Sequence, residues 1–376
     1  MSLGHACVDV YQGAVAALVP FFVAERAWSY AAASGVVLAA SLLSSVVQPL
    51  FGALTDRRAM PWLLPMSALT AGAGVALSGV MGSYPLTLAA VAVSGAGVAA
   101  YHPEAARVAR AVASGGNRGM GWFSLGGNVG FALAPPLVAA VIAAGGLAAS
   151  PLLAVPAVLG AALCATAVRA ARSLPVAGAV GGGGGRDDWP SFLRLSGAVV
   201  CRSVVFVGLS AFVSLYVREH VGGGDVAGTA ALGVLYAGGA VGTVLGGRLA
   251  DRYGRLAVVR GAYVLTVLAV AGVVLVPGPA VFAFVALTSA GLYVPFSLHV
   301  TLGQDYLPGR VGTASGVTLG LTVSVGGLAA PVLGALADAT SLRTALVPLI
   351  VLPALGALLL RGLREPMPTE PLVPAR

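Results

Sequence analysis

The apolar residues of this chain are gathered into stretches of about 20 residues that short polar breaks separate. At a rise of 1.5 Å per residue, a helix of about 20 residues is long enough to cross the hydrocarbon core of a bilayer. In lipid each backbone N–H and C=O must be paired within the protein, so such spans form helices rather than strands. The sequence therefore predicts an all-α membrane protein.

Composition leads to the same class. Only 9% of the 376 residues are charged, whereas soluble domains carry roughly a quarter. The chain therefore lacks the polar coat that a soluble fold of this length requires. The first apolar run has no basic leader and no cleavage site before a soluble domain, so we expect it to remain as a span. The three cysteines are far apart within apolar runs and indicate neither a disulfide nor a metal site: Cys7, Cys164 and Cys201.

We predict twelve transmembrane helices. Those of the first half cover residues 3–24, 29–53, 63–81, 84–105, 119–144 and 149–170. Those of the second half cover residues 192–217, 228–250, 256–276, 279–302, 311–337 and 344–362. The predicted domains are 1–172, a Gly-rich linker at 173–190, a second domain at 191–364 and a tail at 365–376.

Arginine placement predicts the orientation. The net charge of +8 comes from arginine, because the chain has no lysine. If both termini are cytoplasmic, the only arginines outside are Arg26, Arg218 and Arg343, and Arg202 lies within a span. The positive-inside rule requires this asymmetry. We therefore expect a multi-pass protein of the inner cell membrane, and a nucleic-acid partner is not expected.

A short motif occurs twice, and this indicates an internal repeat. Gly52, Asp56 and Arg57 end the second predicted span, and Gly247, Asp251 and Arg252 end the eighth, about 195 residues later. Two related halves are typical of transporters with a substrate site between the repeats. We expect the glycines to let a neighbouring helix approach and the aspartates to hold one face shut as a gating latch. Alternatively, these are topogenic charges beside a turn carboxylate.

The second copy, Gly-x-x-x-Asp-Arg-x-Gly-Arg from Gly247 to Arg255, resembles the signature of the major facilitator superfamily. The first copy departs from it after Arg57. That departure resembles the fosmidomycin-resistance branch, as do four other motifs: His5-x-x-x-Asp9, Gln48-Pro49, Tyr101-His102-Pro103-Glu104 and Gly126-Gly127-Asn128. The resemblance implies two pseudo-symmetric six-helix bundles, a central cavity lined by spans 1, 4, 7 and 10, and export of a drug-like molecule in exchange for protons.

Ionisable groups inside spans are costly and are candidates for function. His5, Asp9 and Gln12 share one face of the first span. A carboxylate balanced between desolvation and a cationic partner can load and release a proton. Alternatively, His5 lies at the membrane interface and a neighbouring helix satisfies Asp9.

Further candidates lie in spans 4, 7 and 10. His102 and Glu104 end the fourth span, although Glu104 could simply pair with Arg107. Arg202 has no acid nearby in the sequence, so we expect Asp9, Glu104 or an anionic substrate as its partner. His299 lies in the tenth span. The predicted cavity wall is Tyr101, Asn128, Tyr293 and Phe296.

These features predict a proton-coupled exporter of a small organic molecule. Proton-coupled import of a small organic anion is the alternative, and Arg202 suggests it. A channel and a membrane-embedded enzyme are disfavoured, since the polar groups form neither a ring nor one catalytic cluster. We expect a monomer in the lipid bilayer, with no cofactor and no metal.

Overall fold

A computed structural model describes residues 1–57, 60–112, 117–171, 187–221, 223–310, 313–314, 317–318 and 322–366. These residues form helices joined by short turns, with no strand among them. The elements of the first part of the chain are α1 (Ser2–Arg26), α2 (Tyr30–Arg57), α3 (Leu63–Ser78), α4 (Tyr84–Val112), α5 (Asn117–Gly145), the 3-10 helix η1 (Gly146–Ala154) and α6 (Val155–Ala171).

After the predicted linker come α7 (Trp189–His220), α8 (Gly224–Tyr253), α9 (Arg255–Leu275), α10 (Val281–Tyr293), α11 (Phe296–Tyr306), η2 (Pro308–Arg310), α13 (Thr322–Ala339), α14 (Leu342–Leu346) and α15 (Pro348–Arg361). Most of the linker, the start of the predicted eleventh span and the end of the tail lie outside the described residues.

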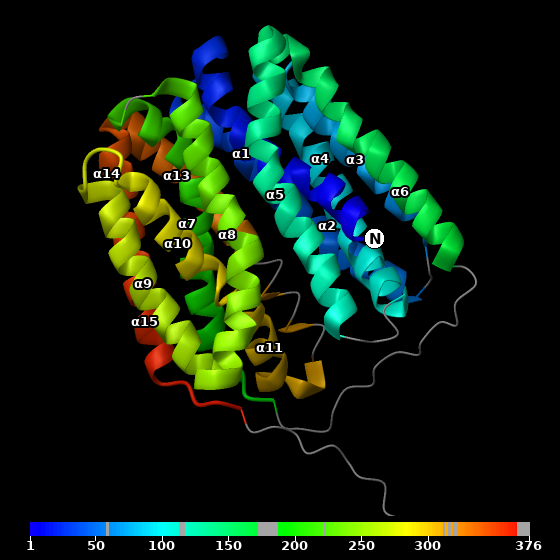
Figure 1. The fold of residues 1–376 in the computed structure, drawn as a ribbon, viewed down its shortest axis with the longest axis vertical. Coiled ribbons are helices and arrows are strands. Elements are labelled where there is room, and N and C mark those ends of the chain that lie inside the picture. Colours follow the sequence, from blue (N-terminus) through cyan, green and yellow to red (C-terminus); the bar gives the residue numbers. More distant parts are fainter. Residues whose placement is uncertain are drawn as a thin grey trace, which may run out of the picture.

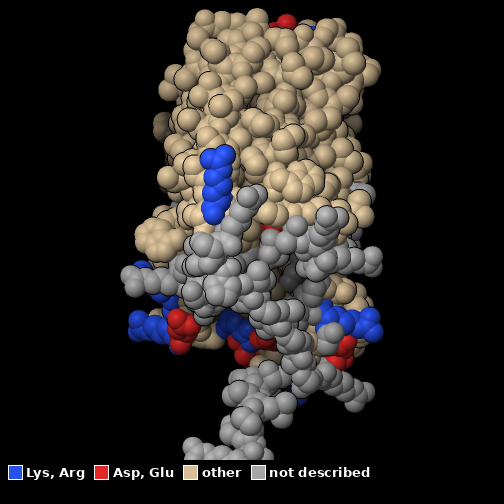
Figure 2. Space-filling view, turned by 90° about the vertical axis from the view of Figure 1, so that its right-hand side faces the viewer, with Lys and Arg blue, Asp and Glu red and all other residues tan. Residues whose placement is uncertain are grey.

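Eight stretches in the described part of the chain are helical, long and apolar enough to cross a membrane. One of them, Leu125–Ala170, runs through α5, η1 and α6 and so covers two predicted spans. Three shorter apolar helices coincide with other predicted spans: Tyr30–Leu43, Leu63–Ser78 and Val325–Ala339. In the view of Figure 2, most of the charged side chains gather at the lower end of the molecule, below a broad surface on which charged side chains are sparse.

The tenth predicted span is not one continuous helix. Pro295 separates α10 from α11, because proline has no N–H to donate and its ring clashes with the preceding turn. The span predicted over 279–302 coincides with the apolar stretch Val281–Tyr306, which Pro295 interrupts. A broken helix places backbone groups and a new helix N-terminus inside the bundle.

Helices pack against one another both within and between the two parts of the chain (Figure 1). α1 packs against α5 and α6, and α4 packs against α2 and α3. In the later part, α8 packs against α7 and α10, and α15 packs against α7 and α9. The most extensive contacts between the parts join α2 with α13 and α5 with α8, and α1 also contacts α7 and α8.

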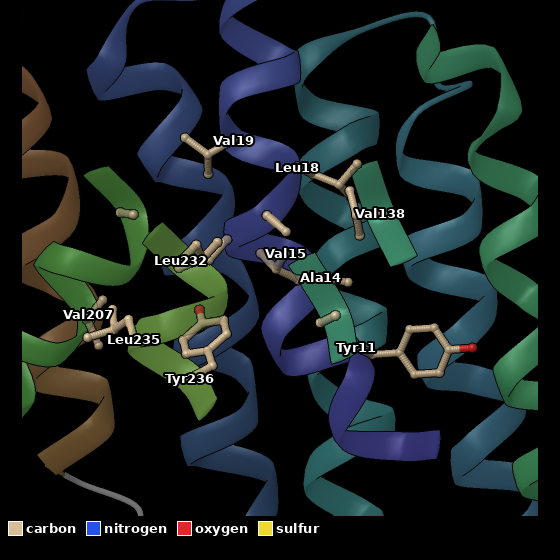
Figure 3. Packing of buried hydrophobic residues seen from close by; sticks show 14 of the residues in the cluster. Tyr11, Ala14, Val15, Leu18, Val19, Val138, Val207, Leu232, Leu235 and Tyr236 are labelled. Carbon is tan, nitrogen blue, oxygen red and sulfur yellow. The ribbon is translucent and has the colours of Figure 1, made fainter. Parts of the chain in front are cut away.

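The main buried cluster extends across both parts. It includes Val15 and Leu18 of α1, Val138 of α5, Val207 of α7 and Leu235 of α8. Figure 3 shows Leu18 beside Val138, and Val207 beside Leu235. We call the end of the molecule where α6 ends and α7 begins the linker face, and the other end the far face.

Candidate functional site

Three side chains predicted from the sequence meet between α1 and α4, and we call them the His–Asp–His cluster. His5 Nε2 lies 3.1 Å from Asp9 Oδ2, and His102 Nε2 lies 3.2 Å from Asp9 Oδ1. The two Nε2 atoms are 3.4 Å apart. The His5 and Asp9 side chains are buried, and that of His102 keeps 24% exposure.

The backbone fixes which ring nitrogens carry hydrogen. His5 Nδ1 lies 2.8 Å from the carbonyl oxygen of Phe123, and His102 Nδ1 lies 2.8 Å from that of Val98. A carbonyl oxygen only accepts, so each Nδ1 is the donor. In a neutral imidazole the Nε2 atom is then an acceptor, and an ionised carboxylate is an acceptor too. Each contact with Asp9 therefore needs a proton on the ring or on the carboxyl group.

Glycines in α5 make room for the cluster. A Cβ on Gly127 would lie 2.5 Å from Asp9 Oδ2 and 2.8 Å from His5 Cε1. Gly126 and Gly130 lie against the backbone of α1 at Ser2 and Ala6. The sequence Gly126-Gly127-Asn128-Val129-Gly130 thus allows α5 to approach α1, as small residues do in membrane helices.

Gln12 connects the cluster to a central cavity. Its Nε2 donates to Asp9 Oδ1 over 3.4 Å, and its side chain lines a cavity of about 100 Å³. The lining residues are Tyr11, Gln12, Val15, Ala16, Val37, Ala40, Ser41, Ser94, Gly95, Val98, Phe131, Phe206, Val207, Ser210 and Tyr236. They come from α1, α2, α4, α5, α7 and α8. The expected contribution from the tenth span is absent from this lining.

An aromatic series leads from the cavity into the later part of the chain. The Phe131 ring lies 5.4 Å from Tyr236, Tyr236 lies 6.1 Å from Phe206, and Phe206 lies 5.7 Å from Tyr293. The sequence analysis missed Phe206, although it is four residues after Arg202 and thus on the same face of α7. That spacing is the signal that would have found it.

Arg202 is buried beside the break between α10 and α11. Its Nη1 donates to the Leu292 carbonyl over 2.8 Å, and its Cζ lies 5.2 Å from the Phe296 ring. No described contact joins it to Asp9 or Glu104, so neither of the two acids pairs with Arg202 here, and the third expected partner, an anionic substrate, stays a prediction. Asp9 is instead bonded to the two histidines, and Glu104 is fully buried elsewhere in α4.

None of the four predicted wall residues, Tyr101, Asn128, Tyr293 and Phe296, lines the central cavity. Tyr101 is fully buried, with its ring 5.9 Å from each histidine of the cluster and its hydroxyl accepting from Cys164. Asn128 lies against Gly239 of α8, which Tyr293 also approaches. Phe296 lies under the Arg202 guanidinium.

Only the second copy of the latch motif can be placed in detail. In the first copy, the surroundings of Gly52 and the side chains of Asp56 and Arg57 lie outside what the structure describes. Gly247 has open space where a Cβ would be, so the expected close helix approach is wrong for this conformation. The neighbouring Gly246 makes that approach, to the backbone of Val294.

The charged residues of the second copy also differ from expectation. Asp251 is exposed and makes no hydrogen bond or ion pair in the described part of the chain, and Arg252 stacks over Tyr253. The last arginine of the motif makes the ion pair, since Arg255 Nη1 lies 2.5 Å from Asp305 Oδ2.

At the far face, contacts that the sequence analysis did not foresee join α2 to α7 and α13. Asp338 of α13 accepts from the amides of Tyr30 and Ala31, over 2.8 and 2.9 Å. The Tyr30 hydroxyl donates to Glu219 of α7. Two α13 glycines, Gly327 and Gly334, pack directly on α2.

Among the described residues, the ligand atoms of His5, Asp9 and His102 are also close enough to hold a metal ion, within 4.8 Å of one another. The contacts between them have hydrogen-bond lengths, which protons satisfy. We therefore interpret the cluster as a proton site.

Comparison with known proteins decides the family. A family model described as Major Facilitator Superfamily matches residues 1–331. This chain belongs to the major facilitator superfamily. Over 379 residues it is 30% identical to the fosmidomycin resistance protein of Escherichia coli, covering 95% of this chain and 90% of that protein. It is 29% identical to an uncharacterized MFS-type transporter, YfnC, of Bacillus subtilis, covering 94% of this chain and 89% of that one.

Solved structures share the fold of this superfamily member. One is a bacterial homologue of the human lysosomal transporter Spinster, in an inward-facing and occupied conformation. Its TM-score is 0.78 at 16% identity, over 96% of this chain and 94% of that one. The nucleoside transporter NupG matches with a TM-score of 0.73 at 12% identity, over 96% and 97%. The predicted superfamily and the resemblance to the fosmidomycin-resistance branch are confirmed. The protein is a multi-pass membrane transporter and not an enzyme.

Proposed function

We propose that this transporter exports a small organic molecule in exchange for protons, by alternating access. The observation that carries the proposal is the His–Asp–His cluster, whose contacts need shared protons and which is joined through Gln12 to the central cavity. A substrate in the cavity that engages Gln12 withdraws one hydrogen bond from Asp9. Substrate and protons would thereby compete for one connected set of groups.

The cluster also supplies a route from proton binding to helix movement. His5 and Asp9 belong to α1, His102 belongs to α4, and His5 is anchored to α5 through the Phe123 carbonyl. Loss of the shared protons leaves acceptors facing one another, which weakens the contact between α1 and α4. Protonation would thus bias how these helices pack.

In our proposal the described conformation is closed at the far face and open toward the linker face. The contacts of Asp338 and Glu219 with α2 support closure at the far face. The exposed Asp251 supports an open linker face, where the latch motif would be released. In the opposite conformation the two copies, Gly52-Asp56-Arg57 and Gly247-Asp251-Arg252, would close that face.

We also propose the number of spans, their division into two bundles and their orientation in the membrane. The proposed topology comprises twelve spans in two pseudo-symmetric bundles, at residues 1–172 and 191–364, in a monomer of the inner membrane with both termini cytoplasmic. The arginine distribution and the charge band at one end in Figure 2 support this orientation. Similarity to a resistance protein supports export.

A second candidate is proton-coupled import of an organic anion. The buried Arg202, which has no carboxylate partner in the described residues, favours it.

Flux measurements in proteoliposomes separate the two directions of coupling. The purified protein is reconstituted, and uptake of labelled fosmidomycin is measured with the lumen acidic, alkaline or at the external pH. Exchange for protons predicts accumulation only in acidic vesicles, and symport predicts accumulation only in alkaline ones. Uptake that ignores the pH gradient would refute proton coupling for this substrate.

A further inference from the structure

Arg202 presents an electrostatic problem that the proton-coupling proposal does not explain. The residue keeps only 8% of its surface exposed, and its Nε atom is buried without a hydrogen-bond partner among the described residues. Its single described hydrogen bond runs to the Leu292 carbonyl. Buried guanidinium groups are ordinarily paired with an anion, because an uncompensated buried charge is costly.

A second polar group beside it also has no partner. His299 is 1% exposed, and neither of its ring nitrogens has a hydrogen-bond partner in the described part of the protein. It lies three residues after Phe296, whose ring Arg202 covers, and Arg202 is near enough to act on it electrostatically. Since no carbonyl or carboxylate fixes its tautomer, either nitrogen is free to donate.

The break in the tenth span adds a third feature. Pro295 starts α11 inside the bundle, and the first amides of a helix have no partner within that helix. In transporters with broken helices, such N-termini face anionic substrate groups. Here the N-terminus of α11 carries Phe296 and His299, so amides, imidazole and guanidinium gather in one place.

The helix face that carries Arg202 also reaches the substrate cavity. Arg202 and Phe206 lie one turn apart on one face of α7, and Phe206 lines the cavity while packing against Tyr293. The cavity offers aromatic and small polar walls, including Phe131, Tyr236 and Ser210. Phe206 is thus the cavity residue one turn from Arg202, and an anionic group would have to pass this ring to meet the guanidinium.

We propose that Arg202, His299 and the N-terminus of α11 form an oxyanion-binding subsite for the carboxylate-like group of a small, largely apolar substrate. This rests on the proposed function in taking the central cavity as the substrate path. The anion supplies the charge that Arg202 lacks and accepts hydrogen bonds from His299.

Equilibrium binding to the purified full-length protein tests the proposal with phenylacetate and its neutral analogue phenylacetamide. The parent should bind phenylacetate more tightly than the amide. Arg202→Ala should weaken phenylacetate binding about tenfold to a hundredfold, as expected for loss of charge-assisted hydrogen bonds, and leave the amide unchanged. His299→Phe should weaken the same anion by a smaller factor. Arg248→Ala, which removes an exposed arginine from α8, is the matched control and should change nothing.

The variant Arg202→Met tests whether a loss of binding is caused by misfolding. Because the subsite account leaves Arg202 unpaired in the ligand-free protein, this apolar replacement should raise the melting temperature. The proposal is overturned if Arg202→Ala or Arg202→Met binds phenylacetate as tightly as the parent. It is also overturned if the parent does not prefer phenylacetate to the amide. These binding measurements use no gradient, so a failure of the subsite is distinguishable from a failure of proton-driven flux.

Discussion

Asp338 should control how long the far face stays closed. Its carboxylate reaches from α13 to the first two amides of α2, and Ser29 accepts from the third, that of Ala32, over 3.2 Å. The N-terminus of α2 is therefore capped largely by a residue from the other part of the chain. We predict that Asp338→Ala shifts the protein toward the conformation that is open at the far face.

The size of the shift follows from the geometry. Loss of a helix cap costs about 0.5–2 kcal/mol, and a carboxylate at a helix N-terminus contributes about 0.3–1 kcal/mol more when exposed. Because Asp338 is exposed, the lower part of the combined range applies. A change of about 1–2 kcal/mol corresponds to a factor of about 5–30 in the ratio of the two conformations.

The assay measures access to the cavity from the far face. Ser41→Cys places a thiol on the cavity wall, and a membrane-impermeant maleimide is added from the far side. The background lacks the native cysteines Cys7, Cys164 and Cys201. Asp338→Ala should raise the labelling rate about 5- to 30-fold.

Asp225→Ala is the control for this assay. Asp225 is an acid at the same face, but it pairs with Arg218 over 2.8 Å, within α7 and α8. This contact does not join the two parts of the chain, so its loss should leave labelling unchanged. Equal labelling rates in the parent and Asp338→Ala proteins would refute the role given to the cap.

Two further predictions concern close approaches of glycine. Gly127→Ala should abolish proton-driven flux while the protein still folds, because the new Cβ would displace the Asp9 carboxylate and the His5 ring; gradient-driven flux at the parent rate would contradict this. Gly246→Ala should destabilise the protein by about 1–3 kcal/mol because the methyl group meets the α10 backbone, whereas Gly247→Ala should leave the melting temperature unchanged. Equal melting temperatures for these two variants would show that α8 does not turn Gly246 toward Val294.

Part of the site could be predicted from local spacing. His5 and Asp9 are four residues apart, so any helix brings them to one face. Their meeting with His102 depends on how α1 packs against α4, which one sequence does not specify. The break at Pro295 has a local cause and was missed only because the apolar stretch continues through it.

Other features depend on helix rotation and on partners distant in the chain. Gly246 and Gly247 differ by about 100° around α8, and the sequence does not indicate which of them faces α10. Arg202 was expected to pair with Asp9 or Glu104 because spacing shows only that its own helix has no acid. Asp338 was missed because an exposed acid at a helix end is ordinary, and only the position of α2 makes it a cap.

The central claim is that Asp9 and its two histidines couple substrate movement to protons. The most direct test is the luminal pH of proteoliposomes under a fosmidomycin gradient, with no pH gradient imposed. The parent and Asp225→Asn proteins should move protons against the substrate, and Asp9→Asn should move none while it still exchanges labelled for unlabelled substrate. Proton movement by Asp9→Asn equal to that of the parent would contradict the account.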